Sequence, residues 1–306
     1  MSIAFVFSGG GSLGAVQVGM LQALHEHGIT ADLLVGTSAG ALNAAYLARH
    51  GQTRAVLDDL AQKWTDLRRG DIFPMSPRRA ILALAGEKPS LFSARGLRAL
   101  LQSELGNLTL EELGTRLLVV TTDLQSGRTA LLSTGDAVSA VVASAAIPGI
   151  LPPIKREGSV LVDGGLADHG YVLRTVATQV DEVFLLPGGS ACALAAPPGS
   201  ALGVASHALT LLIQQGLGTA VTLYTGPAIL HVMPPLCPLG VSPSDFGQAA
   251  TLIARARDTT KSWLDNPPPE RGPAQAKFLS LHSHPRQLPH PAPSVRPRPP
   301  HPGETP

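Results

Sequence analysis

Gly36-Thr37-Ser38-Ala39-Gly40 forms a G-x-S-x-G pattern, in which a serine lies between two glycines. An apolar, strand-like segment at 32–35 precedes the pattern, and an alanine-rich segment of helical period follows it. Between a strand and a helix, the two glycines allow a sharp turn that exposes the serine hydroxyl. The first turn of the helix directs free N–H groups and a positive dipole end to the same place. Ser38 is therefore a candidate nucleophile.

A second glycine-rich stretch, S-G-G-G-S-L-G-A at 8–15, also lies between a strand-like and a helical segment. Gly9, Gly11 and Gly14 satisfy the G-x-G-x-x-G spacing of a dinucleotide-binding loop. That alternative needs an acidic residue at the end of the second strand, where this sequence has Gly36. Consecutive glycines also expose backbone N–H groups to a small anion, such as the oxyanion formed when Ser38 attacks a carbonyl. We therefore favour an oxyanion loop.

A third stretch, S-V-L-V-D-G-G at 159–165, ends an apolar segment with Asp163, followed by Gly164 and Gly165. The two glycines leave the carboxylate at a strand end with little side-chain cover. Asp-Gly is also an ordinary turn sequence, so this motif gains its meaning from the other two. His169 completes the chain order Ser, Asp, His found in α/β-hydrolases. We expect His169 to be a surface or hydrogen-bonded loop residue instead.

These residues need a scaffold, and the periodicity of the chain predicts one. Continuous apolar runs suited to a sheet covered on both faces alternate with segments of helical period. Strands are expected at 3–7, 32–35, 116–122, 129–133, 160–163 and 182–186. Residues 63–112 are expected to form helices inserted beside the sheet, and the apolar stretch 201–223 a buried helix. The pattern predicts a three-layer α/β/α fold with a mostly parallel central sheet.

Composition narrows the class of protein. The chain has 306 residues, of which 44% are hydrophobic and 15% charged, and its 23 Lys and Arg balance 22 Asp and Glu. Such a balance provides no overall field to attract nucleic acid or an anionic bilayer. Cys192 and Cys237 are far apart in the chain and match neither a disulfide framework nor a metal-ligand spacing.

The two ends of the chain carry further expectations. The N-terminus lacks the charged region of a signal peptide, and its apolar run is too short to span a membrane, so we expect a cytoplasmic protein, with peripheral membrane association as a second expectation. From residue 265 onward the sequence holds 13 of the 27 prolines and few core-forming residues. We expect a disordered, proline-rich tail at 265–306 after one domain at 1–264.

Taken in this order, the three motifs resemble those of the patatin-like phospholipase family. The matching stretches are 9–14, 36–40 and 163–165, and segments 121–135 and 143–154 are similar to the connecting segments of that family. The resemblance covers roughly 3–186. It implies a patatin-like fold and a hydrolase that cleaves acyl esters of lipids without a metal or an organic cofactor.

The resemblance also implies the roles of individual residues. Ser38 would be the nucleophile and Asp163 its base, a catalytic dyad without a histidine. Backbone amides of Gly9, Gly10 and Gly11, with Ala39 as a further donor, would form the oxyanion hole; Gly14, Gly36, Gly40, Gly164 and Gly165 complete the motifs. Because a free aspartate has a pKa near 3.9, Asp163 must be partly desolvated to act as a base.

The sequence departs from the family pattern at two places. Leu13 stands where the family commonly has Arg or Lys, and Asp168-His169-Gly170 stands where it commonly approaches Asn-x-Pro. Loss of the cation leaves open whether the substrate is a phospholipid, a neutral lipid, a soluble ester or a thioester. A catalytically silent protein that binds an acyl chain or a partner is a further alternative. Apolar surface in 63–112 or 200–233 is expected to touch a bilayer transiently.

Overall fold

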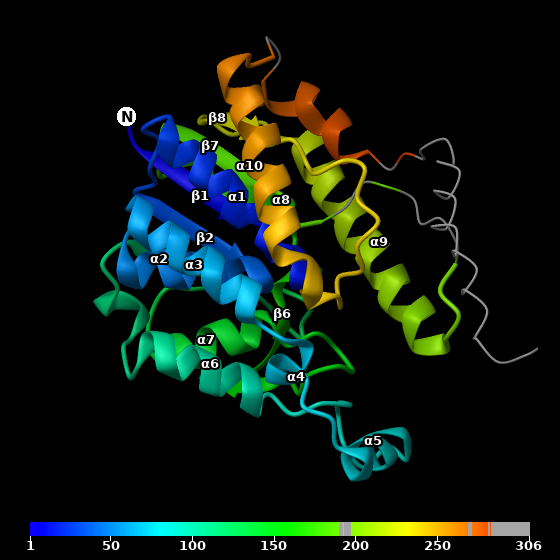
Figure 1. Cartoon of the computed structure of the whole chain (residues 1–306). Coiled ribbons are helices and arrows are strands. Elements are labelled where there is room, and N and C mark those ends of the chain that lie inside the picture. Colours follow the sequence, from blue (N-terminus) through cyan, green and yellow to red (C-terminus); the bar gives the residue numbers. More distant parts are fainter. Residues whose placement is uncertain (190–191, 193–196, 269–270, 281, 283–306) are drawn as a thin grey trace, which may run out of the picture.

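The computed structural model describes residues 1–189, 192, 197–268, 271–280 and 282 (Figure 1). Its strands form from short apolar, often β-branched segments. They are β1 (Ile3–Phe7), β2 (Leu33–Thr37), β3 (Arg116–Asp123), β4 (Thr129–Leu132), β5 (Ile154–Arg156), β6 (Ser159–Asp163), β7 (Glu182–Leu186) and β8 (Ile229–Val232). All six expected strands are present, and β5 and β8 are two that the sequence reading missed.

The strands form one sheet in the order β5-β6-β3-β2-β1-β7-β8, with β4 paired to β3. The central strands β8, β7, β1, β2 and β3 run parallel to one another, whereas β4, β5 and β6 pair in antiparallel fashion. The sheet is therefore mixed, with a parallel centre and an antiparallel edge next to β3. This edge carries Asp163.

The helices occupy both faces of this sheet. They are α1 (Gly14–Glu26), α2 (Ala39–His50), α3 (Arg54–Asp66), α4 (Arg69–Ile72), α5 (Pro77–Leu84), α6 (Arg95–Leu105), α7 (Ala137–Ser144), α8 (His169–Ala177), α9 (Ala201–Thr222) and α10 (Ala249–Asp265). Short 3₁₀ segments are η1 (Gly11–Leu13), η2 (Leu110–Glu112), η3 (Gly164–Leu166), η4 (Phe246–Gln248) and η5 (Gly272–Leu279).

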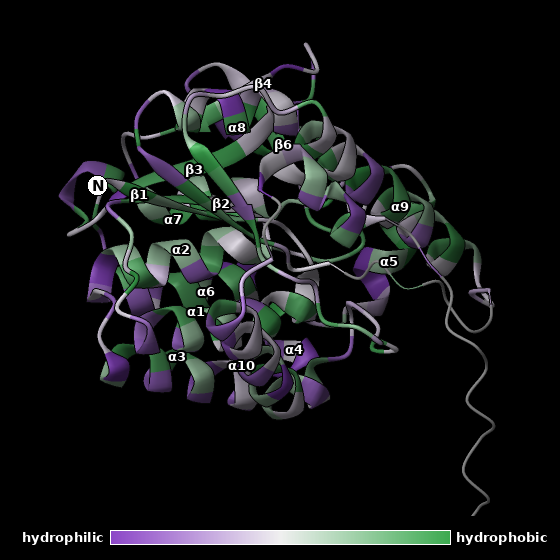
Figure 2. Ribbon diagram, turned by 90° about the horizontal axis from the view of Figure 1, so that it is seen from above, coloured by the Kyte–Doolittle hydropathy of each residue, from purple (hydrophilic) through white to green (hydrophobic). Residues whose placement is uncertain are grey.

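Alternate strand residues divide the core in two, as a covered sheet requires. Phe5 and Phe7 of β1 face a large cluster built with α1, α2, α3, α6, α7 and α10, whereas Ala4 and Val6 face a smaller cluster built with α8, α9 and η5. Figure 2 shows the two helical layers on opposite sides of the sheet. The expected three-layer α/β/α fold is confirmed.

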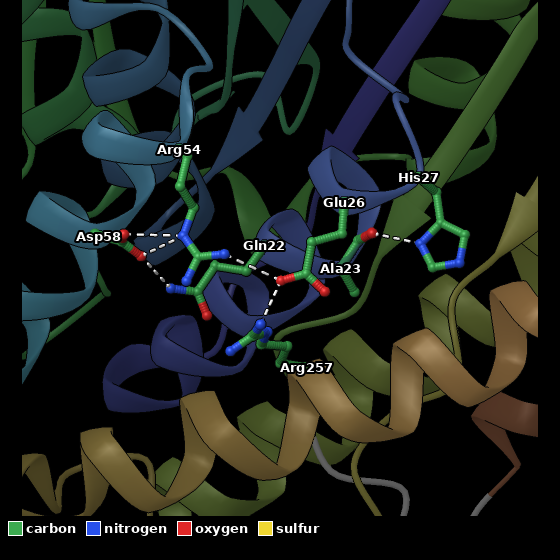
Figure 3. Close-up of polar contacts among 7 residues, drawn as sticks. All are labelled: Gln22, Ala23, Glu26, His27, Arg54, Asp58 and Arg257. Atoms are coloured by element: carbon green, nitrogen blue, oxygen red, sulfur yellow. Dashed lines mark hydrogen bonds and ion pairs between the residues drawn. The ribbon is translucent and has the colours of Figure 1, made fainter.

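Helices α1 and α10, which are far apart in the chain, lie against each other. A Cβ atom on Gly19 of α1 would come within 2.2 Å of the carbonyl oxygen of Ile253 in α10, so only glycine permits this approach. At the end of α1, the Glu26 carboxylate accepts hydrogen bonds from Arg54 of α3 and Arg257 of α10 (Figure 3). The three helices therefore form one packed unit behind the sheet.

Residues 63–112 are helical, as expected. They contain the end of α3, then α4, α5, α6 and η2, all inserted between β2 and β3 in the chain. Leu97, Leu101 and Leu105, spaced four residues apart on α6, are buried against the main core. In contrast, α5 has no buried residue and projects from the body of the molecule (Figure 1).

The expectation of a buried helix at 201–223 is wrong in one respect. The helix exists as α9, but among its residues only Leu217, Ala220 and Val221 are buried. The part of α9 before Leu217 has no buried residue, and Leu202 and Leu212 are exposed. An uncharged, apolar helix is expected to lie against other apolar groups. The sequence does not tell whether these groups belong to the core of the same protein.

The expected tail also differs from the structure in one segment. Within 265–306, η5 packs against α9 and β8. Gln275 of η5 is fully buried, and its Oε1 accepts a hydrogen bond from the Val232 amide of β8 at 2.7 Å. The buried Gln275 side chain thus satisfies a backbone N–H group at the edge of the sheet and helps to hold η5 in place. Composition alone predicts disorder for this segment. The remaining tail residues, 283–306, lie outside the described part of the chain.

Candidate active site

Ser38 lies at the sharp turn between β2 and α2. Its backbone has φ 54° and ψ −123°, a conformation that a non-glycine residue rarely adopts. A Cβ on Gly36 would lie 2.4 Å from the Cα of Ala41, and a Cβ on Gly40 would lie 2.6 Å from the carbonyl oxygen of Ser8. Both glycines of the G-x-S-x-G pattern are therefore required by close packing, as a strained nucleophile turn demands.

Ser144 holds this turn in place and was missed in the sequence reading. The Ser38 amide donates to the Ser144 hydroxyl at 2.9 Å, and that hydroxyl donates in turn to the Val120 carbonyl of β3 at 2.6 Å. Ser144 is fully buried at the end of α7. Its segment, 143–154, was recognised only as a connection; no motif spacing links it to Ser38.

Strand register brings Asp163 next to Ser38. Thr37 of β2 is paired with Val120 of β3, and the next residue of β3, Thr121, is paired with Asp163 of the antiparallel β6. Only β3 therefore separates the end of β2 from the end of β6. The Ser38 side chain acts to stabilise the ionised Asp163 carboxylate, so the two side chains are close enough to interact.

The Asp163 carboxyl group is buried, with 4% of the residue exposed. Burial raises the pKa of Asp163 to about 6, while the hydrogen bonds from the Ser38 side chain and the Gly165 amide act to lower it. The Gly165 amide donates to Oδ1 at 2.7 Å, which fixes the orientation of the carboxylate. The aspartate is thus a stronger base than a solvated one and is still ionised at neutral pH.

The glycine-rich loop lies against the serine. A Cβ on Gly9 would lie 3.1 Å from the Cβ of Ser38, and one on Gly14 would lie 3.1 Å from the Cβ of Ala39. Gly10 and Gly11 are closed in from the other side, where added Cβ atoms would meet the carbonyl oxygens of Gly188 at 1.9 Å and Pro243 at 2.5 Å.

The amides of this loop are available as donors. Among the residues that the structure describes, the N–H groups of Gly9, Gly10, Gly11 and Ala39 donate to no protein acceptor. The neighbouring Ser12 amide is occupied, since it donates to the Pro243 carbonyl at 2.8 Å. Free amides beside a buried hydroxyl are the arrangement that an oxyanion hole requires.

A buried polar network of side chains from α1, α2 and α3 supports the glycine loop, and no sequence motif predicts it. The Gln17 side-chain amide donates to the carbonyls of Ser8 and Leu186 at 2.8 and 3.0 Å. The Asn43 amide donates to the Gln17 oxygen at 2.9 Å, and the Trp64 indole donates to Asn43 at 2.7 Å. Gln17 and Asn43 are fully buried, so the network fixes where β1 ends and the loop begins.

His169 is buried rather than on the surface, which corrects part of the sequence-based expectation. It begins α8, its residue is 9% exposed, and burial lowers its pKa, opposed by a hydrogen bond with the Gly165 backbone. Among the residues that the structure describes, none forms a hydrogen bond with its Nε2 atom. Within the described part of the chain, no hydrogen bond or ion pair joins His169 to Ser38 or Asp163.

Leu13 gives a physical reason for one departure from the family pattern. Its side chain is 2% exposed and belongs to the larger core cluster. A leucine at this position packs in the core, where an arginine or lysine would carry a charge. Burial of its apolar side chain stabilises the fold. The site therefore lacks a cation at this position.

Potential metal ligands gather elsewhere. Cys192 and Cys237, which the sequence reading left far apart and outside any metal site, lie close together with His282. None of the three belongs to the loop, the serine turn or the aspartate strand.

Known proteins with the same motifs allow the chain to be classified. The patatin-like phospholipase family matches residues 5–171, which include the glycine loop, the serine turn and the D-G-G motif. More than half of the chain is matched, and the chain belongs to this family.

Curated relatives include lysophospholipase nte1 of Aspergillus terreus, 31% identical over 189 residues, a match covering 62% of this chain and 12% of the relative. Patatin-like phospholipase domain-containing protein 7 of Mus musculus is 31% identical over 186 residues, covering 58% of this chain and 13% of the relative. The chain thus matches only a small part of the length of these proteins.

Similar solved structures include human GIVD cytosolic phospholipase A2 in complex with methyl gamma-linolenyl fluorophosphonate, with a TM-score of 0.46 and 12% identity over 91% of this chain and 59% of that one. VipD from Legionella pneumophila has a TM-score of 0.42 and 16% identity, covering 86% of this chain and 67% of that one. No helix in the described part of the chain is both long and apolar enough to cross a membrane.

Proposed function

We propose that this chain is a lipid acyl hydrolase that uses Ser38 and Asp163 as a catalytic dyad. The observation that carries the proposal is the strand register that brings a buried Asp163 with a raised pKa next to Ser38 at its strained turn. Membership of the patatin-like phospholipase family and the names of the lysophospholipase relatives support a lipid ester as the substrate.

In the proposed reaction, Ser38 Oγ attacks the ester carbonyl carbon and its proton passes to Asp163. The carbonyl oxygen becomes an oxyanion, stabilised by amides drawn from Gly9, Gly10, Gly11 and Ala39. Collapse breaks the C–O bond, and the departing alcohol takes the proton from Asp163. Water then attacks the acyl-Ser38 ester, gives a proton to Asp163 and releases a fatty acid, after which Ser38 regains its proton.

The raised pKa of Asp163 suits both directions of proton transfer. A carboxylate with a pKa of about 6 accepts a proton more readily than a solvated aspartate, yet most of it is ionised at neutral pH. Because the Gly165 amide holds one carboxylate oxygen, the other is left for the serine. No imidazole is needed between the two residues.

A monoacyl phospholipid is the substrate class that we favour. The buried Leu13 removes a cation from the loop, so the headgroup phosphate is not held there, and recognition relies on the acyl chain. The same dyad would act on soluble esters or thioesters. A chain-length series of p-nitrophenyl esters separates the two, because a lipid hydrolase gains activity with the long chains.

Two apolar elements project on the same side of the molecule and provide a surface for transient bilayer contact (Figures 1 and 2). Ile81 and Leu84 of α5 are 67% and 82% exposed, and Leu202 and Leu212 lie exposed on the uncharged helix α9. Replacement of Leu212 by Asp should reduce co-sedimentation with phosphatidylcholine vesicles; unchanged co-sedimentation would contradict this role.

The central experiment compares the intact protein with Ser38→Ala. We expect a fluorophosphonate probe to label the wild type once per chain and the variant not at all, and mass spectrometry to find fatty acid released from lysophosphatidylcholine only by the wild type. Probe labelling without fatty-acid release would support Ser38 as the nucleophile and contradict lysophosphatidylcholine as the substrate. Absence of labelling in a folded wild type would favour the silent acyl-binding alternative.

A further inference from the structure

Three segments that are remote in the chain bring soft metal ligands together. Cys192 lies in the connection between β7 and α9, Cys237 lies between β8 and α10, and His282 follows η5. The two Sγ atoms are 3.8 Å apart, and the Nε2 of His282 is 3.1 Å from the sulfur of Cys237 and 3.8 Å from that of Cys192. Cys192 is buried, whereas Cys237 and His282 are exposed, so an ion could enter from solvent.

These separations match three corners of a zinc tetrahedron. With Zn–S bonds of about 2.3 Å and a Zn–N bond of about 2.05 Å, tetrahedral angles place two sulfurs about 3.8 Å apart and a sulfur and a nitrogen about 3.5 Å apart. The observed sulfur pair has the first value, and the two sulfur–nitrogen distances lie on either side of the second. A disulfide would instead need the sulfurs at about 2.05 Å.

The surroundings of the ligands are also those of a metal site. The Nδ1 of His282 lies 3.0 Å from the Ser280 carbonyl, which can only accept, so Nδ1 carries the proton and Nε2 keeps its lone pair toward the sulfurs. The Leu239 amide donates to the Cys192 sulfur at 3.4 Å, an interaction that favours the thiolate. A backbone β-bridge joins Cys192 to His282 and holds their segments together.

We propose that Cys192, Cys237 and His282 bind a zinc ion. Soft thiolates with an imidazole in tetrahedral arrangement select zinc among the common divalent ions. On binding, both thiols release their protons to solvent and the neutral imidazole coordinates through Nε2. Among the described residues, Cys192, Cys237 and His282 are the members of the cluster.

The ion would be structural and would stabilise the segments that pack against the glycine loop beside Ser38. The segment leading to Cys192 contains Gly188, whose carbonyl packs on Gly10. The segment following Cys237 contains Pro243, whose carbonyl packs on Gly11 and accepts a hydrogen bond from the Ser12 amide. Zinc binding fastens both segments to each other and to the end of η5, outside the site of the proposed chemistry.

The test measures metal binding in the full-length, reduced protein, and so does not depend on lipid hydrolysis. We expect one zinc ion per chain by elemental analysis, and with Co²⁺ the charge-transfer and visible bands of tetrahedral thiolate coordination. Cys237→Ser and His282→Ala should each weaken zinc affinity by more than about tenfold. His207→Ala, a histidine on α9 outside the cluster, is the matched control and should bind as the wild type does.

Circular dichroism confirms folding of each variant, and the exposed position of His282 makes its replacement the safer one. Zinc should raise the thermal midpoint of the wild type and leave that of the His282→Ala variant unchanged. The proposal is overturned if the wild type takes up no zinc, if both ligand variants bind it as tightly as the wild type, or if intact-mass analysis of freshly isolated protein finds Cys192 and Cys237 in a disulfide.

Discussion

At Asp163, burial and hydrogen bonding act in opposite directions on one carboxyl group. Removal from water raises its pKa, whereas donation from Ser38 and Gly165 stabilises the ionised form, and the balance is a pKa of about 6. In the proposed mechanism, this raised pKa is what lets Asp163 accept the serine proton without a histidine.

Replacing Asp163 with Asn should reduce hydrolysis of lysophosphatidylcholine by more than about a hundredfold, because the proton acceptor is lost. His169→Ala should retain most of the activity, since the structure records no hydrogen bond from His169 to either member of the dyad. Initial rates at equal protein concentration measure both effects. The opposite ranking would overturn the dyad in favour of a triad.

The pH dependence of stability follows from the same carboxyl group. Because the folded pKa lies above the unfolded value of 3.8, the native state holds a proton that the unfolded chain releases between about pH 4 and 6. The free energy of unfolding therefore falls as pH rises through that window, by up to about 3 kcal/mol from this group.

Asp163→Asn does not titrate, so its stability relative to the wild type should improve between pH 4 and 7. Denaturant unfolding at several pH values measures the difference. In parallel, the kcat/KM of the wild type should rise with pH to a plateau above about 6, where Asp163 is ionised. A stability difference independent of pH would mean that Asp163 is not protonated near pH 5 in the folded state.

At the scale of elements, the meeting of β6 with β3 decides whether the dyad forms. Gly164 follows Asp163 so closely against β3 that a Cβ there would lie 2.1 Å from the Val120 carbonyl oxygen. That carbonyl also accepts the hydroxyl of Ser144, which holds the Ser38 amide. One backbone carbonyl thus sets the positions of both ends of the dyad.

Gly164→Ala should therefore lower stability by about 2–3 kcal/mol and abolish most hydrolysis, because β6 must move away from β3. Gly70→Ala on α4 is the control, since an added Cβ there meets nothing within 4 Å. Thermal unfolding and lipid hydrolysis are measured on both variants. A Gly164→Ala protein with unchanged stability and activity would show that the two strands tolerate separation.

The sequence predicted those features that local chemistry determines. Gly36 and Gly40 are needed by the turn at Ser38, and a five-residue pattern is enough to find them. The antiparallel pairing that puts Asp163 beside β3 depends on contacts between remote segments, and only the family resemblance predicted that the two residues act together. Ser144 was not predicted for the same reason. Its hydroxyl accepts a hydrogen bond from the amide of Ser38, which is remote in the chain, and no motif around Ser144 indicates this contact.

The presence of helices and strands was easier to predict than their burial. The apolar, uncharged run 201–223 correctly indicated a helix, but the part before Leu217 has no buried residue, because periodicity measures how apolar a segment is and not what covers it. The short β8 was missed because it has only four residues, one of them a histidine, although Gly226-Pro227 and Pro234-Pro235 bound it. Cys192, Cys237 and His282 came together only in the folded chain.

At the scale of the whole molecule, the family match ends at residue 171, yet later segments complete the core. Helix α10 covers the outer face of α1, and β7 and β8 extend the sheet beyond β1. The contacts of Glu26 with Arg54 and Arg257 at the end of α1 join the early and late parts of the chain (Figure 3). Strands β7 and β8 and helix α10 therefore belong to the same packed body as the region that the family matches.

Gly19→Ala should lower stability by about 3 kcal/mol, because the added methyl group would meet the Ile253 carbonyl and force α10 away from α1. Gly218→Ala on α9 is the matched control, with its nearest contact at 4.0 Å and a gain of up to about 1 kcal/mol from better helix propensity. Urea unfolding monitored by circular dichroism measures both. Equal stability of the two variants would contradict tight packing of α1 against α10.

Because the ribosome makes the chain from its N-terminus, the segments that complete the pocket are synthesised after Ser38 and Asp163. Ser38 and Asp163 leave the exit tunnel before Gly188 and Pro243, whose carbonyls close over the glycine loop, and before α10 covers α1. A nascent chain therefore carries its reactive hydroxyl and carboxylate while the pocket around them is still open to water. The pocket around these two groups therefore takes its final form only after the chain has been made through α10.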